Sequence, residues 1–131
     1  MQTKILMIVS AIFMAAIGLA ASFMPSELLD LADAWSEVVE VSLVQVLGAL
    51  YLGFALLNWT ARSHIASGIY SRPIVLGNFM HTGLVSVILG KLWLANYHTL
   101  PVIIGLVIYA IFAICFAIVL LRLNKINQTN A

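Results

Sequence analysis

Residues 101–121 have the sequence PVIIGLVIYAIFAICFAIVLL, which contains no charged side chain and is followed by Arg122 and Lys125. A helix of about 20 apolar residues matches the thickness of the bilayer hydrocarbon. The rest of the chain is similar, because 63% of its 131 residues are hydrophobic, 8% are charged and the mean hydropathy is +1.11. Soluble domains carry roughly 25% charged residues. The composition therefore excludes a soluble protein and predicts an integral membrane protein.

Three further apolar runs are long enough to span a membrane, and together the four runs predict an all-α integral membrane four-helix bundle in a single domain, residues 1–131. We expect the spans at about 5–24, 40–60, 73–96 and 101–121, with a short amphipathic helix at about 26–38. A cleaved signal peptide is the alternative for the first run, because Lys4 precedes it and small residues lie near its end. We expect a retained span, since the run exceeds the roughly 7–15 apolar residues of a signal peptide. The polar residues 124–131 are expected to form a frayed terminus.

The basic and acidic residues lie on opposite sides of the predicted membrane. Five of the six basic residues flank the side that holds both termini: Lys4, Arg62, Arg72, Arg122 and Lys125. The sixth, Lys91, lies near the outer end of the third span, where a lysine can extend to the headgroups. All five acidic residues lie between the first and second spans, on the outer side. The excess of positive charge predicts that both termini are cytoplasmic.

The acidic segment is one candidate functional surface. On a helix its carboxylates gather on one arc and its apolar side chains on another. The carboxylates belong to Glu27, Asp30, Asp33, Glu37 and Glu40. Ser26 is the expected N-cap of this helix, directly after the helix-breaking Pro25. The simpler interpretation is a helix in the membrane interface, and the alternative is a docking face for a basic protein partner or a loose divalent-cation site.

Polar side chains at bilayer depth form the second candidate site. They fall on one face of the second span and one face of the third: Tyr51, Asn58, Arg62, Asn78, His81 and Thr82. If the two faces meet, these side chains line a pocket that opens to the cytoplasm, in which the small residues Gly48 and Ala55 leave room. Such a pocket can bind a polar headgroup, a quinone carbonyl or a line of waters. The alternative is hydrogen bonding between helices without any ligand.

Small residues at helical spacing form seams along which membrane helices can approach one another closely. The seams comprise Ala11, Ala15, Gly18 and Ser22 in the first span, Ala49 and Gly53 in the second, Gly83, Ser86 and Gly90 in the third, and Ala113 and Ala117 in the fourth. They suit a compact bundle, with one seam left over for a homo-oligomer. Gln45 lies on another face of the second span and is expected to make a packing hydrogen bond.

The usual catalytic and cofactor motifs do not occur in the sequence. Glu40 lies at the start of the second span and no acidic residue lies deeper within a span, which argues against proton-coupled export. The single cysteine, Cys115, excludes an intramolecular disulfide and has no base near it. Haem is not expected, because His81 has no second histidine at bilayer depth, and neither zinc spacing nor a phosphate loop is present. The near-neutral net charge argues against nucleic acid as a partner. The identity of any cofactor stays unknown from the sequence.

The size of the chain, its four spans and the segment Leu47-Gly48-Ala49-Leu50-Tyr51-Leu52-Gly53 resemble the small four-span bacterial membrane proteins of the DoxX-like kind. The resemblance implies a location in the bacterial inner membrane and carries no functional residue across.

The sequence favours a non-enzymatic protein that acts as a subunit of a membrane complex, or that binds a small lipid-like or polar ligand between the second and third spans. One alternative is an oligomeric channel or facilitator whose path is lined by Asn58, Asn78 and His81. A lipid-modifying enzyme that uses His81 for acid–base chemistry is the third hypothesis.

Overall fold

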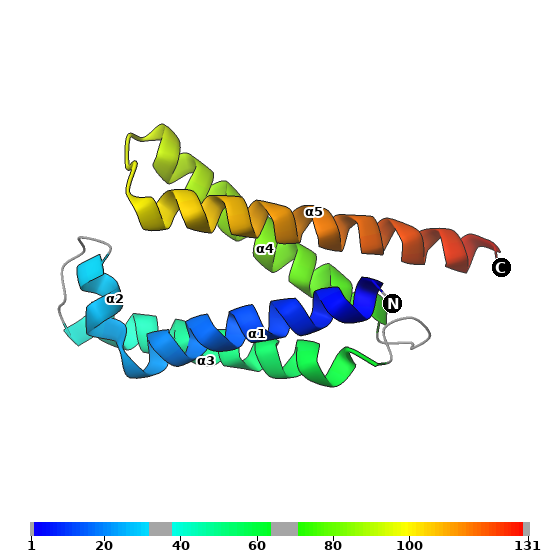
Figure 1. Cartoon of the computed structure of the whole chain (residues 1–131), viewed down its shortest axis with the longest axis horizontal. Helices are drawn as coiled ribbons and strands as arrows, with labels where there is room; N and C mark the ends of the chain where they lie inside the picture. The colour runs from blue at the N-terminus through cyan, green and yellow to red at the C-terminus, as the bar shows by residue number, and fades with distance from the viewer. Residues whose placement is uncertain (1, 32–37, 64–70, 130–131) are drawn as a thin grey trace. The chain divides into compact units, whose positions relative to one another are not determined.

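The computed structural model describes residues 2–31, 38–63 and 71–129, and within these ranges it contains helices and no strands (Figure 1). The helices are α1 (Gln2–Phe23), α2 (Pro25–Leu31), α3 (Val38–Ala61), α4 (Ser71–Leu94) and α5 (Leu100–Thr129). All except α2 are long and apolar enough to cross a membrane. The predicted all-α class and the four spans of a multi-pass membrane protein are thereby confirmed.

The chain divides into two compact units, Met1–Ser63 and His64–Ala131. The N-terminal unit contains α1, α2 and α3, and the C-terminal unit contains α4 and α5. In each unit two long helices pack against each other as a hairpin (Figure 1). The assignment of the whole chain to one domain stays a prediction.

The α1–α3 hairpin is held by a close backbone approach between two glycines. A Cβ atom on Gly48 would lie 2.7 Å from the backbone nitrogen of Ser22 and 2.9 Å from the carbonyl oxygen of Gly18. A Cβ atom on Gly18 would lie 2.9 Å from the backbone nitrogen of Leu52. Only glycine leaves room for this crossing, and the amide of Gln45 reinforces it by donating to the carbonyl oxygen of Ser22 at 3.3 Å.

The predicted seam of α1 is therefore confirmed at Gly18 and Ser22, and so is the packing hydrogen bond of Gln45. The α3 side of the crossing differs from the expected Ala49–Gly53 seam. Ala49 is exposed, and a Cβ atom on Gly53 would meet nothing within 4 Å. The seam of α3 runs instead through Gly48, which helical periodicity places on a different face from Gly53.

Residues 32–37 of the predicted acidic amphipathic helix lie outside the described residues, and α3 begins at Val38. The described part of the predicted helix is α2, Pro25–Leu31. Pro25 is its first residue, where the missing N–H of proline costs nothing, and the N–H of Leu28 donates to the carbonyl oxygen of Met24. Ser26 thus lies inside the first turn, and its prediction as the N-cap is wrong. Asp33 and Glu37 lie outside the described residues.

The α4–α5 connection is a tight turn, as predicted, but α4 ends at Leu94 rather than at residue 96. Asn96 has a positive φ of 67°. The N–H of Tyr97 donates to the carbonyl oxygen of Leu92 at 3.1 Å, and the N–H of Asn96 donates to that of Trp93 at 3.2 Å. This pair of bonds is a Schellman C-cap, for which asparagine is an accepted left-handed residue.

The last helix is longer than predicted. α5 continues to Thr129, so the expectation of a frayed terminus from residue 124 is wrong for the backbone up to that point. No glycine or proline follows Gly105, and nothing in the sequence therefore breaks the helix after the span. Near its start α5 packs closely against α4, because a Cβ atom on Gly105 would lie 3.1 Å from Cδ1 of Leu89.

Candidate functional site

The six polar residues of the predicted ligand site are divided between the two units. Tyr51 and Asn58 lie on α3 and Arg62 directly follows it, whereas Asn78, His81 and Thr82 lie on α4. A shared pocket between the second and third spans stays a prediction.

Asn58 is fully buried and is bonded to α1. Its Nδ2 donates to Oγ of Ser10 at 3.1 Å and lies 3.7 Å from Sδ of Met14. The Ser10 hydroxyl in turn donates to the carbonyl oxygen of Met7 at 3.1 Å. The side chain of Asn58 thus links the two helices of the hairpin. Ser10 was not predicted as a site residue, although a hydroxyl in the middle of an apolar span was the available signal.

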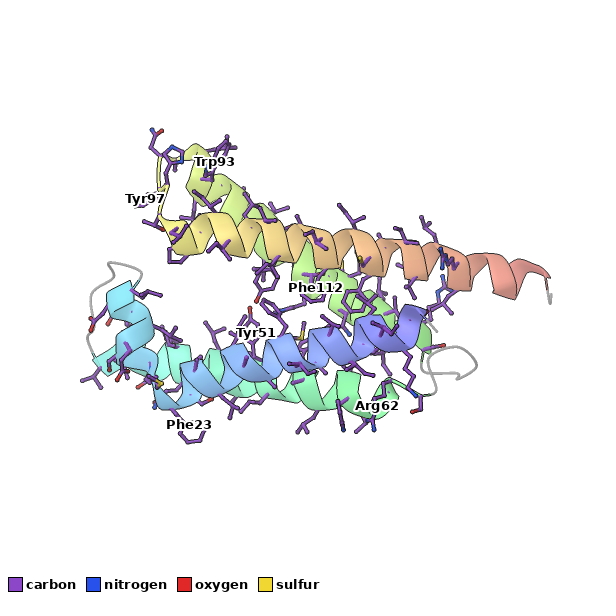
Figure 2. The ribbon with its side chains drawn as sticks, in the orientation of Figure 1. Phe23, Tyr51, Arg62, Trp93, Tyr97 and Phe112 are labelled. Atoms are coloured by element: carbon purple, nitrogen blue, oxygen red, sulfur yellow. The ribbon has the colours of Figure 1, made fainter. Side chains whose placement is uncertain are left out.

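The space beside Gly48 is not available to a ligand. The predicted pocket requires free space for a ligand beside the small residues Gly48 and Ala55. Ser22 of α1 instead occupies the space where a side chain of Gly48 would stand. Ala55 is 6% exposed and belongs to the α1–α3 contact. Tyr51, on the same helix, is half-buried (Figure 2).

Arg62 lies at the end of α3 and is folded back over the last turn of the helix (Figure 2). The guanidinium carbon is 4.0 Å from the centre of the Trp59 ring, and Nη1 donates to the carbonyl oxygen of Trp59. This geometry combines a cation–π contact with a favourable position for a cation at a helix C-terminus. The positive charge is therefore held in one place, beside the indole.

An apolar groove runs along the α1–α3 contact and ends at this indole. Its volume is about 310 Å³, and no polar surface lines it. The lining residues are Ala11, Ile12, Ala15, Leu52, Ala55, Leu56 and Trp59. Alanines from both helices form its floor, since Ala11 and Ala55 are buried, whereas Trp59 is 45% exposed and lies at its edge. The groove was not predicted from the sequence, although Ala11 and Ala15 belong to the predicted seam of the first span.

In the C-terminal unit, two of the three polar residues bond to their own helix. Nδ2 of Asn78 donates to the carbonyl oxygen of Ile74 at 2.9 Å, and Oγ1 of Thr82 donates to that of Asn78 at 2.8 Å. His81 lies edge-on to Tyr109 of α5, with ring centres 6.1 Å apart. Tyr109 is almost completely buried and was not predicted as a site residue. Its hydroxyl in the middle of an uncharged span was the signal.

Three of the five acidic residues are described. Glu27 and Asp30 are exposed on α2, and Glu40 is half-buried in the first turn of α3. Among the described residues, no group of three or more histidine, cysteine, aspartate or glutamate side chains could hold a metal ion. The interface-helix and docking-face interpretations both stay predictions.

No protein-family model, curated protein or solved structure matches the chain.

Proposed function

We propose that this multi-pass membrane protein is non-enzymatic and binds one acyl chain of a lipid-like ligand in the α1–α3 groove. The observation that carries the proposal is the wholly apolar groove of about 310 Å³ within two candidate membrane spans. The proposal includes a bacterial inner-membrane location with cytoplasmic termini, which the resemblance and the distribution of basic residues support. It does not depend on the polar pocket predicted between the second and third spans.

The shape and lining of the groove favour a flexible hydrocarbon chain as its occupant. Ligand pockets of small molecules have volumes of roughly 300–1,000 Å³. The wall atoms of an empty groove lack dispersion contacts on one side. Within a bilayer, lipid acyl chains are the apolar groups that are available to make these contacts. Since Ala11, Ala15 and Ala55 are short, the floor is set back between the larger side chains of Ile12 and Leu56 at the rim.

The groove is supported at both ends by contacts between α1 and α3. The Gly18–Gly48 crossing fixes the helix separation beyond one end, and the Asn58–Ser10 hydrogen bond fixes it near the other. A site whose walls are held in this way is preformed, so binding does not have to order the protein. Because these contacts hold the two helices apart at a fixed distance, they support a persistent lipid site rather than a transient surface depression.

Photo-crosslinking tests this function directly. The full-length protein is reconstituted with phosphatidylcholine that carries a diazirine along one acyl chain, and adducts are mapped by mass spectrometry. We expect adducts to concentrate on the exposed groove residues Ile12, Leu56 and Trp59. The internal control is the opposite depression on α3, of about 270 Å³, which is lined by Ala49, Leu50, Gly53, Phe54 and Leu57.

Both surfaces are largely apolar and include residues 49–59 of α3, so they sample the same lipid at similar depth. Equal adduct yields on the two surfaces would contradict the proposal, because they would indicate ordinary boundary lipid. A yield that falls on the groove when unlabelled phosphatidylcholine is added, but does not fall on the control surface, would support it.

A further inference from the structure

We propose that the groove selects a phospholipid with an anionic headgroup, and that Arg62 recognises its phosphate. This inference rests on the proposed function, because it assigns the headgroup of the lipid whose chain lies in the groove. Two observations carry it: the groove ends at Trp59, and the guanidinium of Arg62 lies 4.0 Å from the centre of that same ring.

The position of Arg62 along the helix suits a headgroup. Arg62 directly follows the candidate span Val38–Ala61, so its charge lies where the hydrocarbon gives way to the interface. A lipid whose chain runs along Ala15 and Ala11 toward Trp59 therefore reaches Arg62 with its polar end. Chain and headgroup are recognised by adjoining parts of one hairpin.

The guanidinium retains donors for a phosphate. Arginine has five N–H donors in a planar fork that matches phosphate geometry. Nη1 donates to the Trp59 carbonyl oxygen, and among the described residues no carboxylate forms an ion pair with the guanidinium. The indole and this carbonyl hold the side chain in place, so less side-chain entropy is lost when the phosphate binds.

Charge complementarity favours an anion at this end of the hairpin. The described acidic residues nearest in sequence belong to the start of α3, where Glu40 lies ~33 Å along the helix from Arg62. Basic residues at a membrane surface attract anionic lipid by about 1 kcal/mol each, which corresponds to about fivefold in affinity.

Fluorescence quenching by brominated lipids tests the selectivity. Trp35 and Trp93 are replaced by phenylalanine, so that Trp59 at the groove edge is the single reporter. The full-length protein is reconstituted in mixtures in which either phosphatidylglycerol or phosphatidylcholine carries the bromine atoms. We expect Trp59 to show about a fivefold preference for phosphatidylglycerol at low salt.

Arg62→Gln is expected to bring this preference close to one, and Arg62→Lys to retain part of it, because lysine keeps the charge but lacks the fork. Arg72→Gln is the matched control, since Arg72 is an exposed arginine at the start of α4, and it is expected to keep the full preference. The Arg62→Lys variant keeps the test valid if the glutamine variant fails to fold.

Equal quenching by the two lipids in the reporter protein, or an unchanged preference in Arg62→Gln, would overturn the headgroup assignment. If phosphatidylcholine still crosslinks selectively to the groove, the proposed function survives that result. If neither brominated lipid quenches Trp59, another protein surface covers the groove. This outcome would contradict both proposals.

Discussion

Replacing Gly48 by alanine is expected to separate α1 from α3 and to lower the free energy of unfolding by about 1–3 kcal/mol. The new Cβ atom would lie 2.5 Å from Oγ and 2.7 Å from the backbone nitrogen of Ser22, and 2.9 Å from the carbonyl oxygen of Gly18. Two of these three atoms belong to the backbone and cannot rotate away. The clash can be relieved only if the helices move apart.

Gly53→Ala is the matched control for this prediction. It places the same methyl group on the same helix, but a Cβ atom there meets nothing within 4 Å. Alanine also has a higher helix propensity than glycine by roughly 1 kcal/mol, so we expect Gly53→Ala to leave stability unchanged or to raise it. Unfolding in mixed micelles, followed by circular dichroism as the denaturing detergent is increased, compares the two variants. Equal stability would show that the α1–α3 crossing is not as close as described.

Asn58→Ala is expected to destabilise the N-terminal unit by about 2 kcal/mol, because it removes a buried hydrogen bond and leaves unfilled volume. The bond from Nδ2 to Oγ of Ser10 is one part of this loss. Ser10→Ala is expected to have a smaller effect, since the alanine side chain is only one atom smaller. Both residues are fully buried, so solvent cannot replace the lost contact.

The double variant separates the hydrogen bond from the other contacts of Asn58. Coupling energies between polar residues in membrane proteins average ~0.6 kcal/mol and reach ~1.7 kcal/mol. We expect a coupling of this size between Asn58→Ala and Ser10→Ala, measured by the same detergent titration. Strict additivity of the two effects would argue against the interhelical bond.

The spans could be predicted from sequence because each depends on the composition of one segment. The uncharged run that ends before Arg122 requires a helix in lipid whatever surrounds it. The ends of the helices depend on smaller local energies, and there the predictions were less accurate. Asn96 in a left-handed conformation ends α4 two residues early, and no such breaker limits α5 after the span.

Helical periodicity predicts which residues of the candidate site share a face, but not which helix packs against that face. The spacing of Gly48, Ala55 and Asn58 placed them on one face of the second span, and all three are buried. The identity of the helix that covers such a face depends on tertiary packing. In the N-terminal unit α1 covers it, with Ser22 at Gly48 and Ser10 at Asn58.

The groove could not have been predicted for a related reason. It arises where alanines of α1 and α3 lie opposite each other, and its position depends on the register of the two helices. That register is set by the Gly18–Gly48 crossing. The stacking of Arg62 on Trp59 was not predicted either, although the two residues are one helical turn apart.

The most direct test of the central claim, that the α1–α3 groove holds a lipid chain, is native mass spectrometry of the protein released from mild detergent. The wild type is expected to retain one lipid. Ala15→Leu fills the groove from its floor and is expected to lose that lipid, whereas Ala49→Leu, on the control surface of the same hairpin, is expected to keep it. Retention of the lipid by Ala15→Leu, or its loss only from Ala49→Leu, would contradict the claim.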